Sequence, residues 1–148
     1  MFRGSCPTRM DEKSRLKIPS AFRRILEERY PGGEFFITST TGDHARIYPM
    51  QTWEEIEAKL AKVSGENISK KRFLDHTNYY GLQQQMDAQG RLVIHSPLRT
   101  DAELQGEVIV IGYLNYLEVW NADRFRRDRL KGNPYTDVDA QALEALGI

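Results

Sequence analysis

The chain has 148 residues, 40% of them hydrophobic, and its 21 basic and 21 acidic side chains give no net charge. A chain of this length buries roughly 68–70% of its unfolded surface on folding, which is enough for one domain with a stable core. The single cysteine, Cys6, excludes an internal disulfide framework and a zinc site made of several thiolates.

The first 24 residues are strongly basic. They carry seven basic and two acidic side chains, so the remainder has a net charge of −5. Such asymmetry suggests a polyanion bound at one end, although a solvated surface is the simpler explanation of charge alone. The segment Met1–Cys6 lacks the apolar stretch of a signal peptide, and the longest apolar run, 108–114, is far shorter than the roughly 20 residues of a membrane span. We therefore expect a soluble, cytoplasmic protein with no membrane partner.

The first elements follow from local patterns. Leu16 and Ile18 alternate with basic residues, which predicts a half-buried strand with its basic side chains outward. Ser20 stands where a helix should begin and is expected to cap it through its hydroxyl. That helix should cover 21–29 and end at the Pro-Gly-Gly of 31–33.

The middle of the chain predicts a hairpin and two helices. Strands are expected over 34–40 and 44–48, around a turn at 41–43. Thr52 followed by Glu55 resembles a capping box, so a helix should open there and bury Trp53. A further helix is expected over 67–80.

The second half begins with a tight turn at 87–90, where Gly90 can take a positive φ. A returning strand covers 91–94, and Ser96 is expected to cap a helix with a proline in its first turn. A buried strand over 107–110 follows, and then a helix from about Ala122 to Lys131 capped by Asn121. We interpret 132–148 as a tail, in which a partner can induce a helix over 140–146.

An internal repeat organises these elements. Residues 10–23 and 86–99 align without gaps at an offset of 76, and seven of the fourteen positions are identical. The strand at 34–37 corresponds to 107–110, and the segment that starts at Arg46 corresponds to the one that starts at Glu118. Two copies of one module therefore fill most of the chain.

The residues of the repeat resemble the MraZ family within the SpoVT-AbrB class. The resemblance rests on the opening Met1-Phe2-Arg3-Gly4, on the doubled Asp-x-x-x-Arg motif with its following Leu and Ile, and on the segments 47–53 and 112–120. It covers about residues 1–130. One copy of the motif would be weak support, but two copies at this spacing are specific.

The resemblance implies an α+β fold, mainly a β-barrel with flanking helices, made of two swapped-hairpin AbrB-like repeats in one chain. We expect a first module over 1–66, a connecting helix over 67–81, a second module over 82–131 and a C-terminal tail over 132–148, with the modules interleaved into one compact domain. Members of the family form rings of many subunits. They bind short direct repeats of promoter DNA upstream of the division and cell-wall gene cluster, so the partners implied are double-stranded DNA, at the nucleoid, and further copies of the chain.

Two positions depart from the family pattern. Ser14 stands where a glycine usually precedes the motif arginine, so the first turn should either differ or carry strain. His95 replaces a proline or small residue and is expected to be a surface residue.

The DNA-binding residues are expected in copy one. Arginine pairs bidentately with guanine O6 and N7, and basic side chains at phosphates release counterions. Arg15 is the leading candidate, although its pairing with an aspartate across the turn is the structural alternative. The candidates that surround it are Arg3, Arg9, Lys13 and Lys17. Because Arg91 lies among glutamines along the chain, we expect Arg91, Asp87 and Asp11 to be structural.

Other classes of function are less well supported. Cys6, His44, His76 and His95 are the candidate nucleophile and bases, but none lies in a catalytic motif. No glycine-rich phosphate loop or metal-spaced set of ligands occurs, so we expect no enzyme activity, cofactor or metal. An antitoxin that pairs DNA binding with a toxin-binding tail, and a structural ring protein that binds a protein partner, remain as alternatives.

Overall fold

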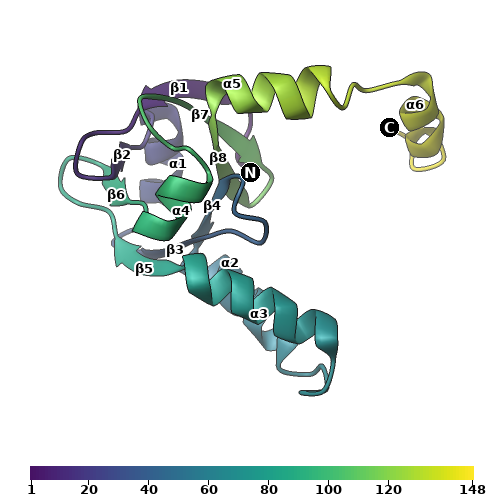
Figure 1. The fold of residues 1–148 in the computed structure, drawn as a ribbon, viewed down its shortest axis with the longest axis horizontal. Coiled ribbons are helices and arrows are strands. Elements are labelled where there is room, and N and C mark those ends of the chain that lie inside the picture. Colours follow the sequence, from purple (N-terminus) through teal and green to yellow (C-terminus); the bar gives the residue numbers. More distant parts are fainter.

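The computed structural model describes residues 1–148 and has the α+β architecture that the family resemblance implies (Figure 1). The copy-one elements are β1 (Ser5–Arg9), β2 (Arg15–Lys17), α1 (Ser20–Arg29), β3 (Glu34–Thr38), β4 (Ala45–Pro49) and α2 (Met50–Leu60). They are followed by α3 (Ile68–Tyr80), β5 (Leu82–Gln85), β6 (Arg91–Val93), α4 (Ser96–Asp101), β7 (Glu107–Tyr113) and β8 (Tyr116–Asn121). The chain ends with α5 (Ala122–Phe125), the π-helix η1 (Arg126–Lys131) and α6 (Asp137–Glu144).

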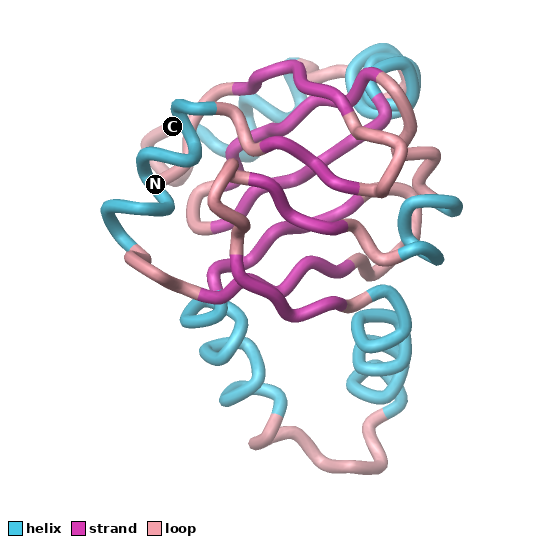
Figure 2. The backbone as a smooth tube through the Cα atoms, turned by 90° about the vertical axis from the view of Figure 1, so that its left-hand side faces the viewer, coloured by secondary structure: helices cyan, strands magenta, loops and turns pink.

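The two copies are interleaved. Six antiparallel strands form one sheet in the order β1-β7-β8-β4-β3-β5, and β2 pairs with β6 in a second, two-stranded sheet. Only β3–β4 and β7–β8 pair within a copy, whereas β1–β7, β4–β8, β3–β5 and β2–β6 each join one copy to the other. Figure 2 shows the strands side by side across the centre of the molecule, with α2 and α3 extending beyond them. Neither copy can therefore complete its sheet alone.

The sheet is not closed into a barrel by backbone hydrogen bonds. The edges of the large sheet are β1 and β5, and the small sheet lies between them. On one side Met10 forms an isolated bridge with Leu16. On the other side a side chain replaces the ladder, because Gln84 Nε2 donates to the carbonyl of Val93 at 2.7 Å and Gln84 Oε1 accepts from the N–H of Val93 at 2.5 Å. The expected barrel is thus an open sheet whose gap is spanned by β2 and β6.

The core draws on both copies. Nineteen buried hydrophobic residues form one cluster, and many of them are equivalent positions of the repeat. Leu16 lies opposite Leu92 in the β2–β6 register, and both are fully buried. Alternation along these short strands places their charged neighbours on the outer face.

Three helices, α1, α2 and α4, begin without the side-chain caps expected from the sequence. Ser20 and Ser96 are the first helical residues rather than caps, and the preceding residues, Pro19 and His95, make no side-chain capping bond. α2 begins at Met50, directly after Pro49, so Thr52 is inside the helix and the expected capping box is wrong. The fixed φ of proline brings the chain from extended to helical conformation without a side-chain cap.

Two other helix expectations are confirmed. The Asn121 side chain accepts a hydrogen bond from the N–H of Arg124 at 3.0 Å and caps α5. The helix expected over 67–80 is α3, with Asn67 at its N-cap. No helix of the chain is both long enough and apolar enough to cross a membrane.

The bonds of Gln84 across the gap predict a specific loss of stability. Gln84→Ala should lower the free energy of unfolding by about 1–3 kcal/mol, the net value of two hydrogen bonds, measured by urea denaturation. Gln85→Ala, on the exposed face of the same strand, is the matched control and should change it by less than about 0.5 kcal/mol. Equal effects of the two variants would show that Gln84 does not join β5 to β6.

Candidate nucleic-acid interface

The two Asp-x-x-x-Arg motifs form turns of the same geometry. Asp11 Oδ1 accepts hydrogen bonds from the backbone N–H of Lys13 and of Arg15, both at 2.9 Å, and Oδ2 accepts from Arg15 Nε at 2.6 Å. In copy two, Asp87 accepts from two backbone N–H groups at 2.9 Å and from Arg91 Nε at 2.8 Å. Each aspartate therefore holds both the turn and its arginine.

The same bonds keep the aspartates charged. The backbone N–H of Arg15 lowers the pKa of Asp11, and the arginine side chain lowers it further, which outweighs the opposing effect of desolvation. The pKa of Asp87 is lowered by the backbone N–H of Arg91 in the same way. Both carboxylates remain ionised at neutral pH and can fix a guanidinium in one orientation.

Ser14 adopts the left-handed conformation that Gly90 has in copy two. Their φ angles are +63° and +75°, so the serine leaves the turn unaltered and holds a conformation that a side chain disfavours. The Ser14 hydroxyl accepts a hydrogen bond of 2.6 Å from Arg99 Nη1. In the equivalent place, Arg23 packs against Gly90 and donates to the carbonyl of Ala88 at 3.2 Å. The first helix of each copy thus supports the turn of the other.

The small sheet gives the basic residues a common face. Leu16 and Leu92 point inward, so their neighbours in the strands lie on the outer face. In the register, Arg15 lies opposite Val93 and Lys17 lies opposite Arg91. Arg91 therefore lies beside Lys17 of copy one. The residues next to Arg91 in the sequence did not indicate this basic neighbour.

The other candidate residues divide into two groups. Lys13 belongs to the turn of Arg15, and Arg9 ends β1 next to the Met10 bridge, so both lie near the small sheet. Arg3 follows Phe2, which bridges Leu114 at the other end of β1. The five residues of β1, about 16 Å of strand, lie between Arg3 and the basic turn, so the structure does not bring Arg3 to it. We call the outer face formed by Arg9, Lys13, Arg15, Lys17 and Arg91 the basic face.

The guanidinium of Arg15 is only partly used within the chain. Nε is bonded to Asp11, while neither Nη group makes a hydrogen bond or ion pair. The side chain is 30% exposed. The arginine is therefore oriented by its turn and keeps two donors for a ligand.

A buried polar network lies where β4 of copy one pairs with β8 of copy two. Glu118 is 1% exposed; its Oε1 accepts from Trp120 Nε1 at 2.9 Å, and its Oε2 lies 3.5 Å from Arg46 Nε and 3.4 Å from His44 Nε2. His44 is stacked on Trp120 with ring centroids 4.4 Å apart, and its Nδ1 lies 2.6 Å from Asp43. Burial alone would raise the pKa of Glu118, but bonds from His44 and Trp120 and the charge of Arg46 hold it below its usual value.

Sequence reasoning treated His44 only as a candidate base and missed this network. One signal was present, since Arg46 and Glu118 are equivalent positions of the repeat with opposite charges. The register shows that they are direct partners.

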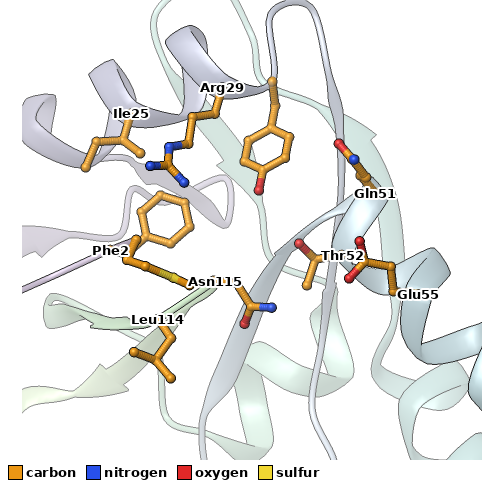
Figure 3. A pocket seen from close by; sticks show the side chains of 10 residues that line it. Phe2, Ile25, Arg29, Gln51, Thr52, Glu55, Leu114 and Asn115 are labelled. Carbon is orange, nitrogen blue, oxygen red and sulfur yellow. The ribbon is translucent and has the colours of Figure 1, made fainter.

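A separate pocket of about 210 Å³ lies between α1, the start of α2 and the β7–β8 turn (Figure 3). Its lining mixes apolar side chains such as Ile25 and Leu114 with Arg29 and Glu55. Its volume is below the roughly 300–1,000 Å³ typical of small-molecule sites. This pocket is therefore smaller than a typical small-molecule site.

Comparison with known proteins is consistent with the repeat. A family model described as "MraZ protein, putative antitoxin-like" matches residues 1–76 and 81–144. The chain is 49% identical to the "Transcriptional regulator MraZ" of Acidobacterium capsulatum and 45% identical to that of Koribacter versatilis, in each case over 148 residues and the whole of both chains. It is 33% identical to the protein of the same name from Tolumonas auensis, over 99% of this chain and 91% of that one.

The strained turn of copy one predicts a graded response at Ser14. Ser14→Ala keeps the left-handed residue but removes the acceptor for Arg99, whose Nε is already buried without a partner. It should lower the free energy of unfolding by about 2 kcal/mol. Ser14→Gly also removes the strain and should lose about 1 kcal/mol less. Thermal unfolding measures both, with Ser69→Ala on α3 as control; a Ser14→Gly protein less stable than Ser14→Ala would contradict this account.

The buried network predicts a pH-dependent loss. Glu118→Gln should lower the free energy of unfolding by about 3 kcal/mol at pH 7, because it removes one partner of a buried ion pair, whereas Glu107→Gln at an exposed site should not. A carboxylate with a lowered folded-state pKa stabilises the protein above its unfolded-state pKa, and that stability disappears as the pH falls through the folded value. The difference between wild type and Glu118→Gln should therefore shrink as the pH falls below the ordinary value of 4.5. A difference that stays constant between pH 7 and pH 3 would refute this role.

Proposed function

The chain belongs to the MraZ family, whose relatives above are named transcriptional regulators, and on that premise we propose that it regulates transcription by binding double-stranded DNA sequence-specifically through the basic face. The observation that carries the proposal is the state of Arg15. It is fixed by Asp11 through Nε, and both of its Nη groups are free of partners within the chain.

Two free Nη groups suit base recognition. A guanidinium held in one orientation can donate two hydrogen bonds to O6 and N7 of a guanine in the major groove. Asp11 lowers the entropic cost of that contact, because the arginine is already ordered before it binds. The role of Asp11 in this proposal is to position Arg15.

The surrounding lysines supply the sequence-independent part of binding. Lys13 and Lys17 lie beside Arg15, and Arg9 lies at the end of β1. Each such charge at a phosphate releases condensed counterions, so affinity should fall steeply with salt. Copy two has Gln89 and Val93 where copy one has Lys13 and Lys17, so we assign base reading to copy one. Arg91, held by Asp87, supports the turn of copy two and adds its charge beside Lys17.

The proposal includes self-assembly. We place the protein at the nucleoid, bound as a ring-shaped homo-oligomer to short direct repeats in the promoter of the division and cell-wall gene cluster. One basic face is small, but adjacent subunits on adjacent repeats raise the effective concentration of each further contact. The division of the chain into modules 1–66 and 82–131, a connecting helix and a tail is part of the same proposal.

Removing the Arg15 side chain should abolish sequence-specific binding to DNA. Arg15→Ala should lower affinity for the promoter duplex at least about tenfold, the value of one bidentate base contact, and should remove the preference over a scrambled duplex. Fluorescence anisotropy at two salt concentrations measures both quantities. Arg72→Ala, which removes an exposed arginine of α3, is the matched control and should bind as wild type.

Each outcome has a distinct meaning. An Arg15→Ala protein with unchanged preference would overturn the assignment of Arg15. Wild-type protein that binds heparin, the promoter duplex and the scrambled duplex equally would overturn sequence-specific recognition and favour a structural ring protein instead.

A further inference from the structure

The C-terminal helix α6 has no packing partner within the chain. It spans Asp137–Glu144, beyond the far end of η1, and stands clear of the sheets in Figure 1. None of its residues is buried. Val138, Leu146 and Ile148 are 74%, 72% and 79% exposed.

An isolated helix of this kind is not stable by itself. Helices shorter than about 12–15 residues are marginal in water, and α6 has eight residues. A capping box between Thr136 and Asp139 favours its first turn. Val138 and Ala142 lie four residues apart on one face of α6, and Leu146 follows in the turn just past its end. This apolar surface needs another surface to cover it.

A groove on the sheet offers such a surface. The outward side chains of β7, Ile109 and Ile111, form its floor beside Gly4 and Ser5, and Phe125 and Leu130 form its wall. Its volume is about 490 Å³. Leu130 is 55% exposed. We call this surface the β7–η1 groove.

The charges of the two surfaces are complementary. Residues 132–148 carry three acidic side chains and no basic one. η1 carries four basic side chains and one acidic one, and Arg126 lines the groove. The helix is therefore acidic with an apolar face, and the groove is apolar with one basic side chain, Arg126, on its lining, where Asp123 already pairs with it at 2.9 Å.

We infer that α6 of one copy docks in the β7–η1 groove of a second copy of this chain. The inference rests on the self-assembly proposed above and names one of its contacts. A second copy is the occupant because the linker leads α6 away from its own groove. Only five residues join η1 to α6, and Figure 1 shows that they lead α6 away from the sheets.

The test uses one variant on each surface of the full-length protein. Val138→Asp places a charge on the apolar face of α6, and Leu130→Asp places one in the groove, both at exposed sites that leave the core untouched. Native mass spectrometry and light scattering should show each variant dissociating at protein concentrations about tenfold or more above wild type. Val63→Asp, an exposed apolar residue between α2 and α3, is the matched control and should assemble as wild type. Circular dichroism confirms that each variant is folded.

Mixing the two variants identifies the occupant. A Leu130→Asp copy has an intact α6 and a Val138→Asp copy has an intact groove, so an equimolar mixture should form heterodimers with one copy of each. A mixture that behaves as the sum of its parts would show that α6 of one copy does not contact the β7–η1 groove of another and would overturn the inference. Single variants that assemble as wild type would also overturn it, while leaving the ring and DNA proposals intact. A monomeric wild-type protein would overturn the ring, and this contact with it.

Discussion

The antiparallel pairing of β2 with β6 joins the two copies at the point where the core meets the basic face. It places Leu16 against Leu92 in the core, so each copy buries the strand of the other. The same alternation turns Arg15, Lys17 and Arg91 to the outer face, because successive side chains of a strand point to opposite sides. A shift of one residue in this register would expose both leucines and bury the charges. The register of this pairing therefore sets the core and the basic face together.

The two copies share a backbone but differ in what they present. Both turns are held by an aspartate that accepts two backbone N–H bonds and one bond from an arginine, and both contain a residue with positive φ. Copy one uses Ser14 there and surrounds its arginine with lysines, whereas copy two uses Gly90 and has Gln89 and Val93 in the lysine positions. Duplication thus supplied one geometry twice. In the proposed function, only copy one, whose arginine is surrounded by lysines, reads the DNA sequence.

The β4–β8 pairing has a different chemistry from β2–β6. Equivalent positions of the repeat again lie opposite each other, but here they are Arg46 and Glu118 instead of two leucines. A pairing of copy one with another copy one in this register would place two arginines together, and like charges in direct opposition are destabilising. Unlike charges therefore favour pairing between the two halves of a chain. His44 and Trp120 complete the network and satisfy the buried carboxylate.

Features that depend on near neighbours in the chain could be predicted from the amino-acid pattern. The offset of 76 revealed the repeat, strand alternation separated leucines from basic residues, and the need for positive φ marked Gly90 and Ser14, since turn geometry depends on only a few consecutive residues. Features that depend on distant segments became visible only in the folded chain. Only the register placed Arg91 beside Lys17, only packing buried Glu118, and only the side chain of Gln84 bridged a gap that backbone pairing left open. Strand partners are chosen by the surfaces they bury together, and those surfaces come from residues up to 106 positions apart, as Ser5 and Ile111 are.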